Sequence, residues 1–161
     1  MLFKAYQKLL GTSCLALYLM GCGSGGGVES PVEMTSNNKG EFQISSKADS
    51  VTIQGVKLNR GNCVVNFVPV DQMSGLLILG LITPISMQDF KDVASAYKEL
   101  GQKERVANIE NKISQLEQNG VMMEPQTLKF GEKIKGISQG CDIIEAEIQT
   151  DKGAWTFNFN R

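Results

Sequence analysis

The sequence predicts an α+β protein in which an antiparallel β-sheet or small β-sandwich carries an inserted helical hairpin. Two observations predict this fold class. Apolar and polar residues alternate in short stretches of residues 41–70 and 125–161, a pattern typical of strands with one buried face. Between these regions, apolar residues recur at every third or fourth position, which is typical of helices. The β part therefore lies on both sides of the insertion.

Two strands are expected at the start of the β part. Residues 41–46 alternate, with Phe42 and Ile44 on one face. Residues 50–58 alternate as well, but their apolar positions change parity at Gly55. A β-bulge at this glycine would absorb the extra residue and keep the apolar side chains on the core side.

Shorter strands are expected on either side of the insertion. The segment 59–62, Asn-Arg-Gly-Asn, has the composition of a turn. The apolar run 63–68 is predicted to be a strand that stops at Pro69, since proline cannot donate to a ladder. After the insertion, residues 127–130 and 132–137 are predicted to add one or two more strands.

The C-terminal region has the clearest strand pattern. Apolar residues occupy every second position of 144–148 and of 155–159, and a short turn containing Asp151 and Gly153 separates the two segments. This arrangement predicts a β-hairpin with one apolar face and one wet face. The residues predicted to lie in the core are Val51, Ile53, Val65, Phe67, Ile144, Ile148, Trp155 and Phe157.

The insertion, with its helical part at about residues 86–120, is predicted to be two antiparallel helices. Ser86 and Asp89 have the spacing of a capping box at a helix start. One straight helix would carry the apolar residues before and after Gly101 on nearly opposite sides. A break at this glycine lets both sets face inward, and a single helix buried on two sides is the alternative. Asn-Gly at 119–120 is suited to a left-handed cap at the end.

The N-terminal segment has the anatomy of an export signal. Lys4 and Lys8 form a short positive region, and residues 9–20 are mostly apolar. This apolar stretch is shorter than the roughly 20 residues that a stable membrane span needs. The segment is therefore expected to be removed on export.

Leu19-Met20-Gly21-Cys22 ends this stretch and resembles the lipobox of bacterial lipoprotein precursors. In that family a peptidase cuts before the cysteine, so the resemblance implies cleavage between Gly21 and Cys22. It also implies that Cys22 becomes the first mature residue and carries a diacylglyceryl thioether, usually with an N-acyl chain such as palmitate. Gly23 is not the aspartate that often retains such proteins at the inner membrane, so the resemblance favours the outer membrane.

The chain is thus expected to have three parts. Residues 1–21 are the lipoprotein signal peptide, residues 22–40 a flexible tether rich in glycine and serine, and residues 41–161 a single β-rich domain. Small side chains give the tether no preferred direction. The glycines within residues 23–27 follow no strand, so they do not indicate a phosphate-binding loop.

Four cysteines are present, and two of them are left for the folded domain. Cys14 lies in the signal peptide, and Cys22 is the expected site of lipid attachment. Because an exported protein matures in an oxidising compartment, Cys63 and Cys141 are expected to form a disulfide. Free thiols are one alternative and a metal site is another, but the chain has no histidine and no C-x-x-C pair to bind zinc. No metal or cofactor is expected.

The residues indicate no catalytic site. Without histidine, the commonest general base and the histidine-activated nucleophiles are missing. The S-x-x-K motif occurs at 36–39 and 95–98, but the S-D-N and K-T-G elements that accompany it in Ser/Lys enzymes do not. Glu145 and Glu147 share a strand face, as a carboxylate pair would, but alternating charges are typical of a solvated strand face. The chain is expected not to be an enzyme.

The charge and the hydropathy pattern indicate which kinds of partner the chain could bind. A net charge of −1, from 16 basic and 17 acidic residues, provides no clustered basic face for nucleic acid. The apolar run 76–82 is predicted either to be buried in the core or to be an exposed patch that binds a partner. In the second case the partner surface comprises Leu76, Leu77, Leu79 and Leu81.

These features favour an outer-membrane-anchored lipoprotein with a non-enzymatic binding or scaffolding role in the envelope, for example in a secretion, conjugation or exclusion system. The expected partners are the membrane, through the lipid on Cys22, and another envelope protein; no nucleic acid is expected. One alternative is a small periplasmic inhibitor of a lytic enzyme, acting through a loop at 59–62 or 151–153. Another is an enzyme that uses carboxylates, namely Asp142, Glu145 and Glu147.

Overall fold

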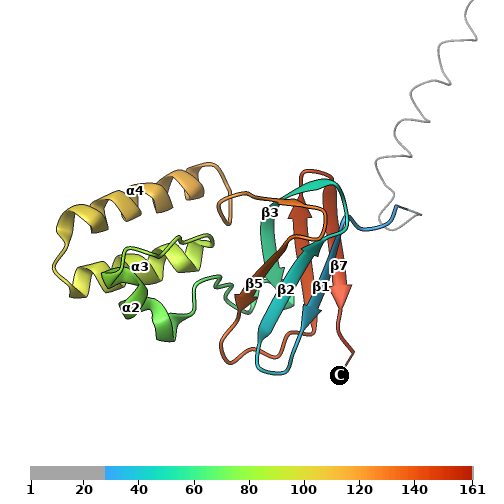
Figure 1. The fold of residues 1–161 in the computed structure, drawn as a ribbon, viewed down its shortest axis with the longest axis horizontal. Coiled ribbons are helices and arrows are strands. Elements are labelled where there is room, and N and C mark those ends of the chain that lie inside the picture. The colour runs from blue at the N-terminus through green and yellow to red at the C-terminus, as the bar shows by residue number, and fades with distance from the viewer. Residues whose placement is uncertain (1–27, 161) are drawn as a thin grey trace, which may run out of the picture.

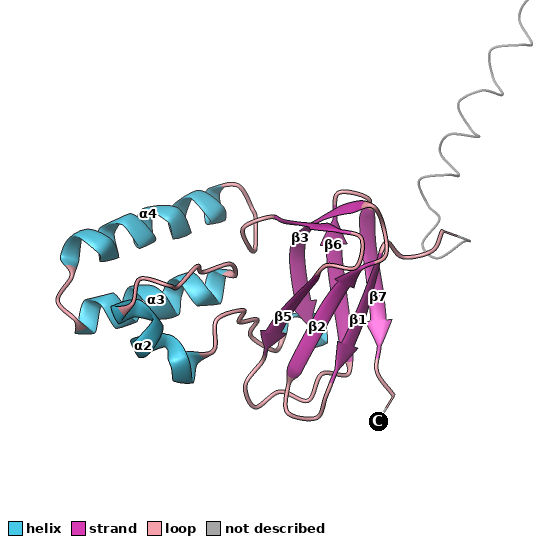
Figure 2. Ribbon diagram, in the orientation of Figure 1, coloured by secondary structure: helices cyan, strands magenta, loops and turns pink. Residues whose placement is uncertain are grey.

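The computed structural model describes residues 28–160, and it confirms the predicted α+β fold class. Two antiparallel sheets, of three and four strands, form a sandwich, and a helical lobe projects from one side of it (Figure 1). The strands gather in one part of the molecule and the long helices in the other (Figure 2).

The first sheet has the strand order β1-β2-β5. Its strands are β1 (Val32–Ser36), β2 (Glu41–Ser46) and β5 (Lys133–Ile137), all paired antiparallel. Gly136 lies so close to Phe42 that a Cβ atom there would be 2.2 Å from the ring. Glycine at this position therefore makes room for an aromatic side chain that is only 4% exposed.

The second sheet has the strand order β4-β3-β6-β7. Its strands are β3 (Ser50–Leu58), β4 (Gln126–Lys129), β6 (Glu145–Thr150) and β7 (Gly153–Asn158). The register of β3 against β6 shifts between Ile53 and Gly55, which confirms the expected bulge. The hairpin β6–β7 is confirmed as well.

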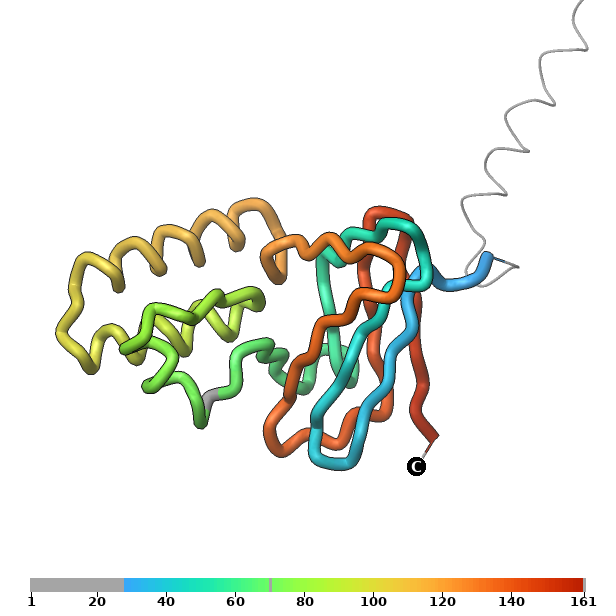
Figure 3. The backbone as a smooth tube through the Cα atoms, viewed as in Figure 1, coloured from blue at the N-terminus to red at the C-terminus, as the bar shows by residue number. Residues whose placement is uncertain are grey.

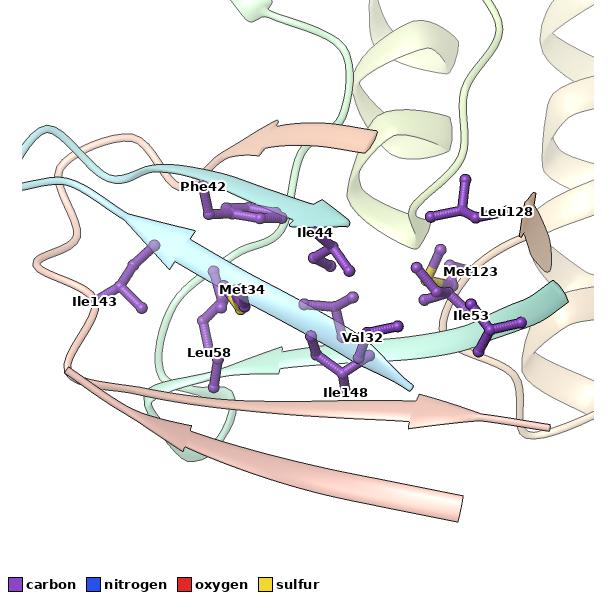
Figure 4. Packing of buried hydrophobic residues seen from close by; sticks show 13 residues of the cluster. Val32, Met34, Phe42, Ile44, Ile53, Leu58, Met123, Leu128, Ile143 and Ile148 are labelled. Carbon is purple, nitrogen blue, oxygen red and sulfur yellow. The ribbon is translucent and has the colours of Figure 1, made fainter. Parts of the chain in front are cut away.

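The sandwich core lies between the two sheets, where the labelled side chains of β1, β2, β3 and β6 meet (Figure 4). Val51, Ile53 and Ile148 are fully buried, as predicted. Met123 and Ile143, which lie outside the strands, complete the cluster. The core therefore draws on segments from both sides of the helical insertion.

The helical lobe has its own small core and follows the predicted hairpin design. Its elements are η2 (Val70–Gln72), α2 (Met73–Ile78), α3 (Met87–Glu99) and α4 (Lys103–Gln118). Ser86 and Asp89 form the expected capping box at the start of α3. Gly101 breaks the chain between α3 and α4 at a φ of 69°. The chain leaves the sandwich after β3, runs through the lobe and returns to β4 (Figure 3).

The strand β1 lies within residues 22–40, for which the sequence predicts a flexible tether. That prediction is wrong for residues 32–36, because Val32 and Met34 are 1% and 6% exposed and belong to the sandwich core. Only five residues alternate here, among polar neighbours, so the pattern is too short to stand out. Residues 22–27 lie outside the described part of the chain.

Two further predictions are wrong. Residues 63–68 form isolated bridges but no strand, because this segment crosses from the sandwich to the lobe. Ile144 is 55% exposed and Ile143 is fully buried, because β6 begins at Glu145 and the chain turns Ile143 inward just before it. Four residues predicted for the core are half-buried: Val65, Phe67, Trp155 and Phe157.

Candidate partner-binding surface

Cys63 and Cys141 form the expected disulfide. Their Cα atoms are 6.1 Å apart, and 78 positions separate them in the chain. The bond joins the segment after β3 to the segment before β6, so it ties together the two halves of the sandwich that flank the insertion. In the chain-entropy model, closing a loop of this size stabilises the folded state by about 4 kcal/mol.

The turn beside this disulfide, η1 (Asn59–Gly61), has a left-handed backbone. The φ angle is 47° at Asn59, 59° at Arg60 and 89° at Gly61. Glycine adopts this region freely and asparagine tolerates it, but it costs other residues about 1–2 kcal/mol. The turn is therefore strained at Arg60.

The side chain of Asn59 holds this turn in place. Its Oδ1 accepts hydrogen bonds from the backbone N–H groups of Ile144 and Glu145, at 2.9 and 3.1 Å. Its Nδ2 donates to the carbonyl of Asp142 at 2.8 Å. Arg60 is left on the outside, with a side chain that is 83% exposed and ion-paired to Glu145 at 3.4 Å.

Asp89 joins the helical lobe to the sandwich. Its carboxylate is 0% exposed, and it accepts hydrogen bonds of 3.0–3.2 Å from the backbone N–H groups of Phe67, Val68, Ile85 and Ser86 and from Nδ2 of Asn66. Asn66 in turn exchanges two backbone hydrogen bonds with Ile137 of β5, at 3.0 and 2.7 Å. The sequence identifies Asp89 only as a capping residue, because no local pattern marks the donors at residues 66–68.

An exposed apolar patch lies on the lobe, where α2 ends. Ile78, Leu79 and Leu81 are 78%, 68% and 67% exposed, and Leu100, just after α3, is 53% exposed. A hollow of about 330 Å³ that both Ile78 and Leu100 line connects the end of α2 with the end of α3. We call these four residues the distal patch. Gly80, at a φ of 66°, provides the left-handed turn that directs its neighbours outward.

The distal patch only partly matches the predicted partner surface. Leu79 and Leu81 are exposed, Leu76 is half-buried and Leu77 is 4% exposed. The prediction is wrong for Leu77 because it lies on the face of α2 that packs against Val93 of α3. Ile78 and Leu100 are not in the predicted surface. Each of them continues an apolar pattern that is equally typical of a buried core, so the sequence does not mark them as exposed.

Two larger hollows flank the segment that links the sandwich to the lobe. One, of about 510 Å³, includes Val64 and Met122, which are 51% and 38% exposed. The other, of about 580 Å³, is lined by polar groups that include Glu41, Asp71 and Lys135. The apolar side chains of these two hollows are less exposed than the four side chains of the distal patch.

Within residues 28–160 the candidate catalytic groups are engaged in other contacts. The hydroxyl of Ser95, in the second S-x-x-K match, donates to the carbonyl of Lys91 at 3.0 Å. Glu145 pairs with Arg60, and Glu147 accepts a hydrogen bond from a neighbouring glutamine at 3.0 Å. No group of three histidine, cysteine or acidic side chains in this range could hold a metal ion.

The lipobox, with its cleavage point between Gly21 and Cys22, lies outside the described residues. In the part of the chain that is described, no helix combines the length and the apolar character that crossing a bilayer requires. Compared with family models, with curated proteins and with solved structures, the chain matches none of them.

Proposed function

We propose that the protein is a lipid-anchored component of a bacterial envelope that binds another envelope protein and catalyses no reaction itself. The resemblance of Leu19-Met20-Gly21-Cys22 to a lipobox supports the anchor, which would place acyl chains on Cys22. The same resemblance favours the outer membrane, because Gly23 stands where an aspartate often retains lipoproteins at the inner membrane. The tether is then shorter than the sequence predicts, because β1 already begins at Val32.

The distal patch carries the binding part of this proposal. Met73 and Leu77 are the buried residues of α2 and pack that helix into the lobe, whereas Ile78 and Leu79 stay exposed. Burying a large aliphatic side chain releases about 1.5–3 kcal/mol, which a partner would gain at each such position. Clustered aliphatic side chains on the surface of a domain are typical of protein–protein contacts.

The position of the patch fits an anchored protein. The described chain starts beside β1, on the side of the sandwich that faces away from the lobe (Figure 1). A lipid on Cys22 would hold that side toward the membrane. The lobe and its distal patch would then extend away from the bilayer, where another protein can reach them.

Cross-linking in intact cells tests the proposal. A photoactivatable residue at position 79 of the full chain should give a discrete adduct with one envelope protein, and the adduct should vanish when Leu81→Lys is added. Position 114 on α4 is the matched control, because Ser114 is an exposed polar residue of the same lobe. The same adducts from both positions, or adducts with phospholipid alone, would refute binding through the patch.

A second candidate function is inhibition of a lytic enzyme through the η1 turn. The strained backbone at Arg60, braced by Asn59 and the disulfide, presents a pre-ordered cationic side chain. A pre-ordered loop binds a cleft with little loss of entropy. The full chain should then inhibit a purified peptidoglycan hydrolase, and Arg60→Ala should weaken inhibition at least tenfold. No inhibition across a panel of such enzymes removes this candidate.

A further inference from the structure

The strand β7 ends the four-stranded sheet, on the side of the sandwich away from the lobe (Figure 1). Its inner edge pairs with β6, and the N–H of Phe159 continues the ladder by donating to Ile144 at 2.9 Å. Hydrogen-bonded positions alternate along an antiparallel ladder, so the N–H and C=O groups of Ala154, Thr156 and Asn158 point outward. The described part of the chain supplies no hydrogen-bond partner for them.

The other three edge strands of the described sheets carry features that discourage further pairing. β1 has Glu33, β5 has Lys133 and Lys135, and β4 is only four residues long and ends in Lys129. β7 differs from all three. Residues 153–160 contain no charged residue and no proline, and the pairing with β6 runs without a bulge. This edge is therefore open to another strand.

The core-facing side chains of β7 are large and incompletely covered. Trp155, Phe157 and Phe159 are all half-buried. Phe157 and Phe159 pack against the sandwich core, but among residues 28–160 the sheet ends at β7 and no further strand flanks them. An added strand would cover the outer sides of these rings.

We propose that this strand is β7 of a second copy of the chain, paired antiparallel with Thr156 opposite Thr156. In this register Ala154 faces Asn158 of the other copy, so each outward N–H meets an outward C=O. Trp155 lies opposite Phe157 of the other copy, and cross-strand aromatic pairs of this kind stabilise sheets. The contact is self-complementary, as a two-fold dimer requires.

Charge favours a second copy over the strand of another protein. Opposite charges usually select a foreign partner, and residues 153–160 offer none. Two neutral edges meet without like-charge repulsion. The dimer contact lies on the opposite side of the molecule from the distal patch, so self-pairing leaves both patches open (Figure 1). This inference is therefore independent of the proposed function.

A cysteine at the two-fold axis tests the register. Two Thr156→Cys residues would place their Cα atoms about 5.5 Å apart in a hydrogen-bonded pair, within the roughly 4.4–6.8 Å that a disulfide spans. We expect mild oxidation of cells that express this full-chain variant to give a dimer of the chain. Thr35→Cys is the control, because Thr35 is also exposed on an edge strand, and it should stay monomeric.

A proline variant separates pairing from folding. Thr156→Pro removes only an outward N–H, so the ladder with β6 stays while the dimer is lost. Phe157→Pro removes an inward donor and should unfold the hairpin. The readouts are sedimentation of the full chain in detergent and circular dichroism. A cross-link from Thr156→Cys to a different protein, no cross-link at all, or a dimer that survives Thr156→Pro would overturn the inference.

Discussion

Asp89 organises the junction between the sandwich and the lobe through its single carboxylate. The group is fully buried and meets donors from the linking segment 66–68 and from the residues that precede α3. A buried carboxylate is stable only when hydrogen bonds replace the water it has lost. This one side chain therefore accepts several of the hydrogen bonds that fix the linking segment against the start of α3.

Replacing the Asp89 carboxylate should lower the stability of the folded protein. Asp89→Asn keeps the size but presents an amide N–H₂ to backbone donors, so at least one buried N–H loses its acceptor. We expect the free energy of unfolding to fall by about 3 kcal/mol in urea titrations. Asp92→Asn is the control, because Asp92 is half-buried and accepts hydrogen bonds from two side-chain amides instead of from backbone N–H groups. Equal losses in the two variants would contradict a special role for Asp89.

Backbone strain at Arg60 gives the second test at this scale. Arg60→Gly removes the Cβ atom that disfavours a φ of 59°. We expect the free energy of unfolding to rise by about 0.5–1 kcal/mol, after the entropy that glycine adds to the unfolded chain is subtracted. Arg60→Ala keeps the Cβ atom and should bring no gain. Equal stability of the two variants in urea titrations would show that the turn is not strained.

Elements with strong local patterns could be predicted from the sequence. The capping box at Ser86, the break at Gly101 and the bulge at Gly55 depend on neighbours within a few residues, and all three are confirmed. The sequence does not reveal β1, because its own pattern is too short and the strand is defined by its pairing with β2. Residues 63–68 have the composition of a strand, but their long-range role as a link to the lobe overrides that local preference.

Because β1 belongs to the sandwich, substitutions of its buried residues should destabilise the fold. Met34→Ala should lower the free energy of unfolding by about 2–4 kcal/mol, because it opens a cavity in the core. Val28→Ala is the matched change in the chain just before β1, where Val28 is 78% exposed, and it should have an effect below about 0.5 kcal/mol. Chemical denaturation measures both. A tether that extended to residue 40 would make the two changes equally harmless.

At the scale of the whole molecule, the sequence predicts the fold class, the disulfide and a helical insertion between two groups of strands. It could not distinguish buried from exposed residues within the run 76–82, because that choice depends on which face of α2 meets α3. Leu77 and Leu79 are two residues apart and have opposite environments. The distal patch is therefore a property of the packed lobe, and composition alone does not reveal it.

The two parts of the molecule should differ in stability. Leu116 is the one buried residue of α4, whereas β3 has five buried residues: Val51, Ile53, Gly55, Val56 and Leu58. We expect amide hydrogens of α4 to exchange with solvent at least tenfold faster than those of β3 and β6, because the lobe opens without unfolding the sandwich. Hydrogen exchange with mass spectrometry measures this. Uniform protection would mean that lobe and sandwich unfold as one unit.

The intact mass of the protein extracted from membranes under non-reducing conditions tests the central claim most directly, beside that of a Cys22→Ser variant. We expect the mass of residues 22–161 plus acyl groups, less the hydrogens lost to the Cys63–Cys141 bond, and no lipid on the variant. An unlipidated mass, or one that still includes residues 1–21, would contradict a lipid-anchored envelope protein.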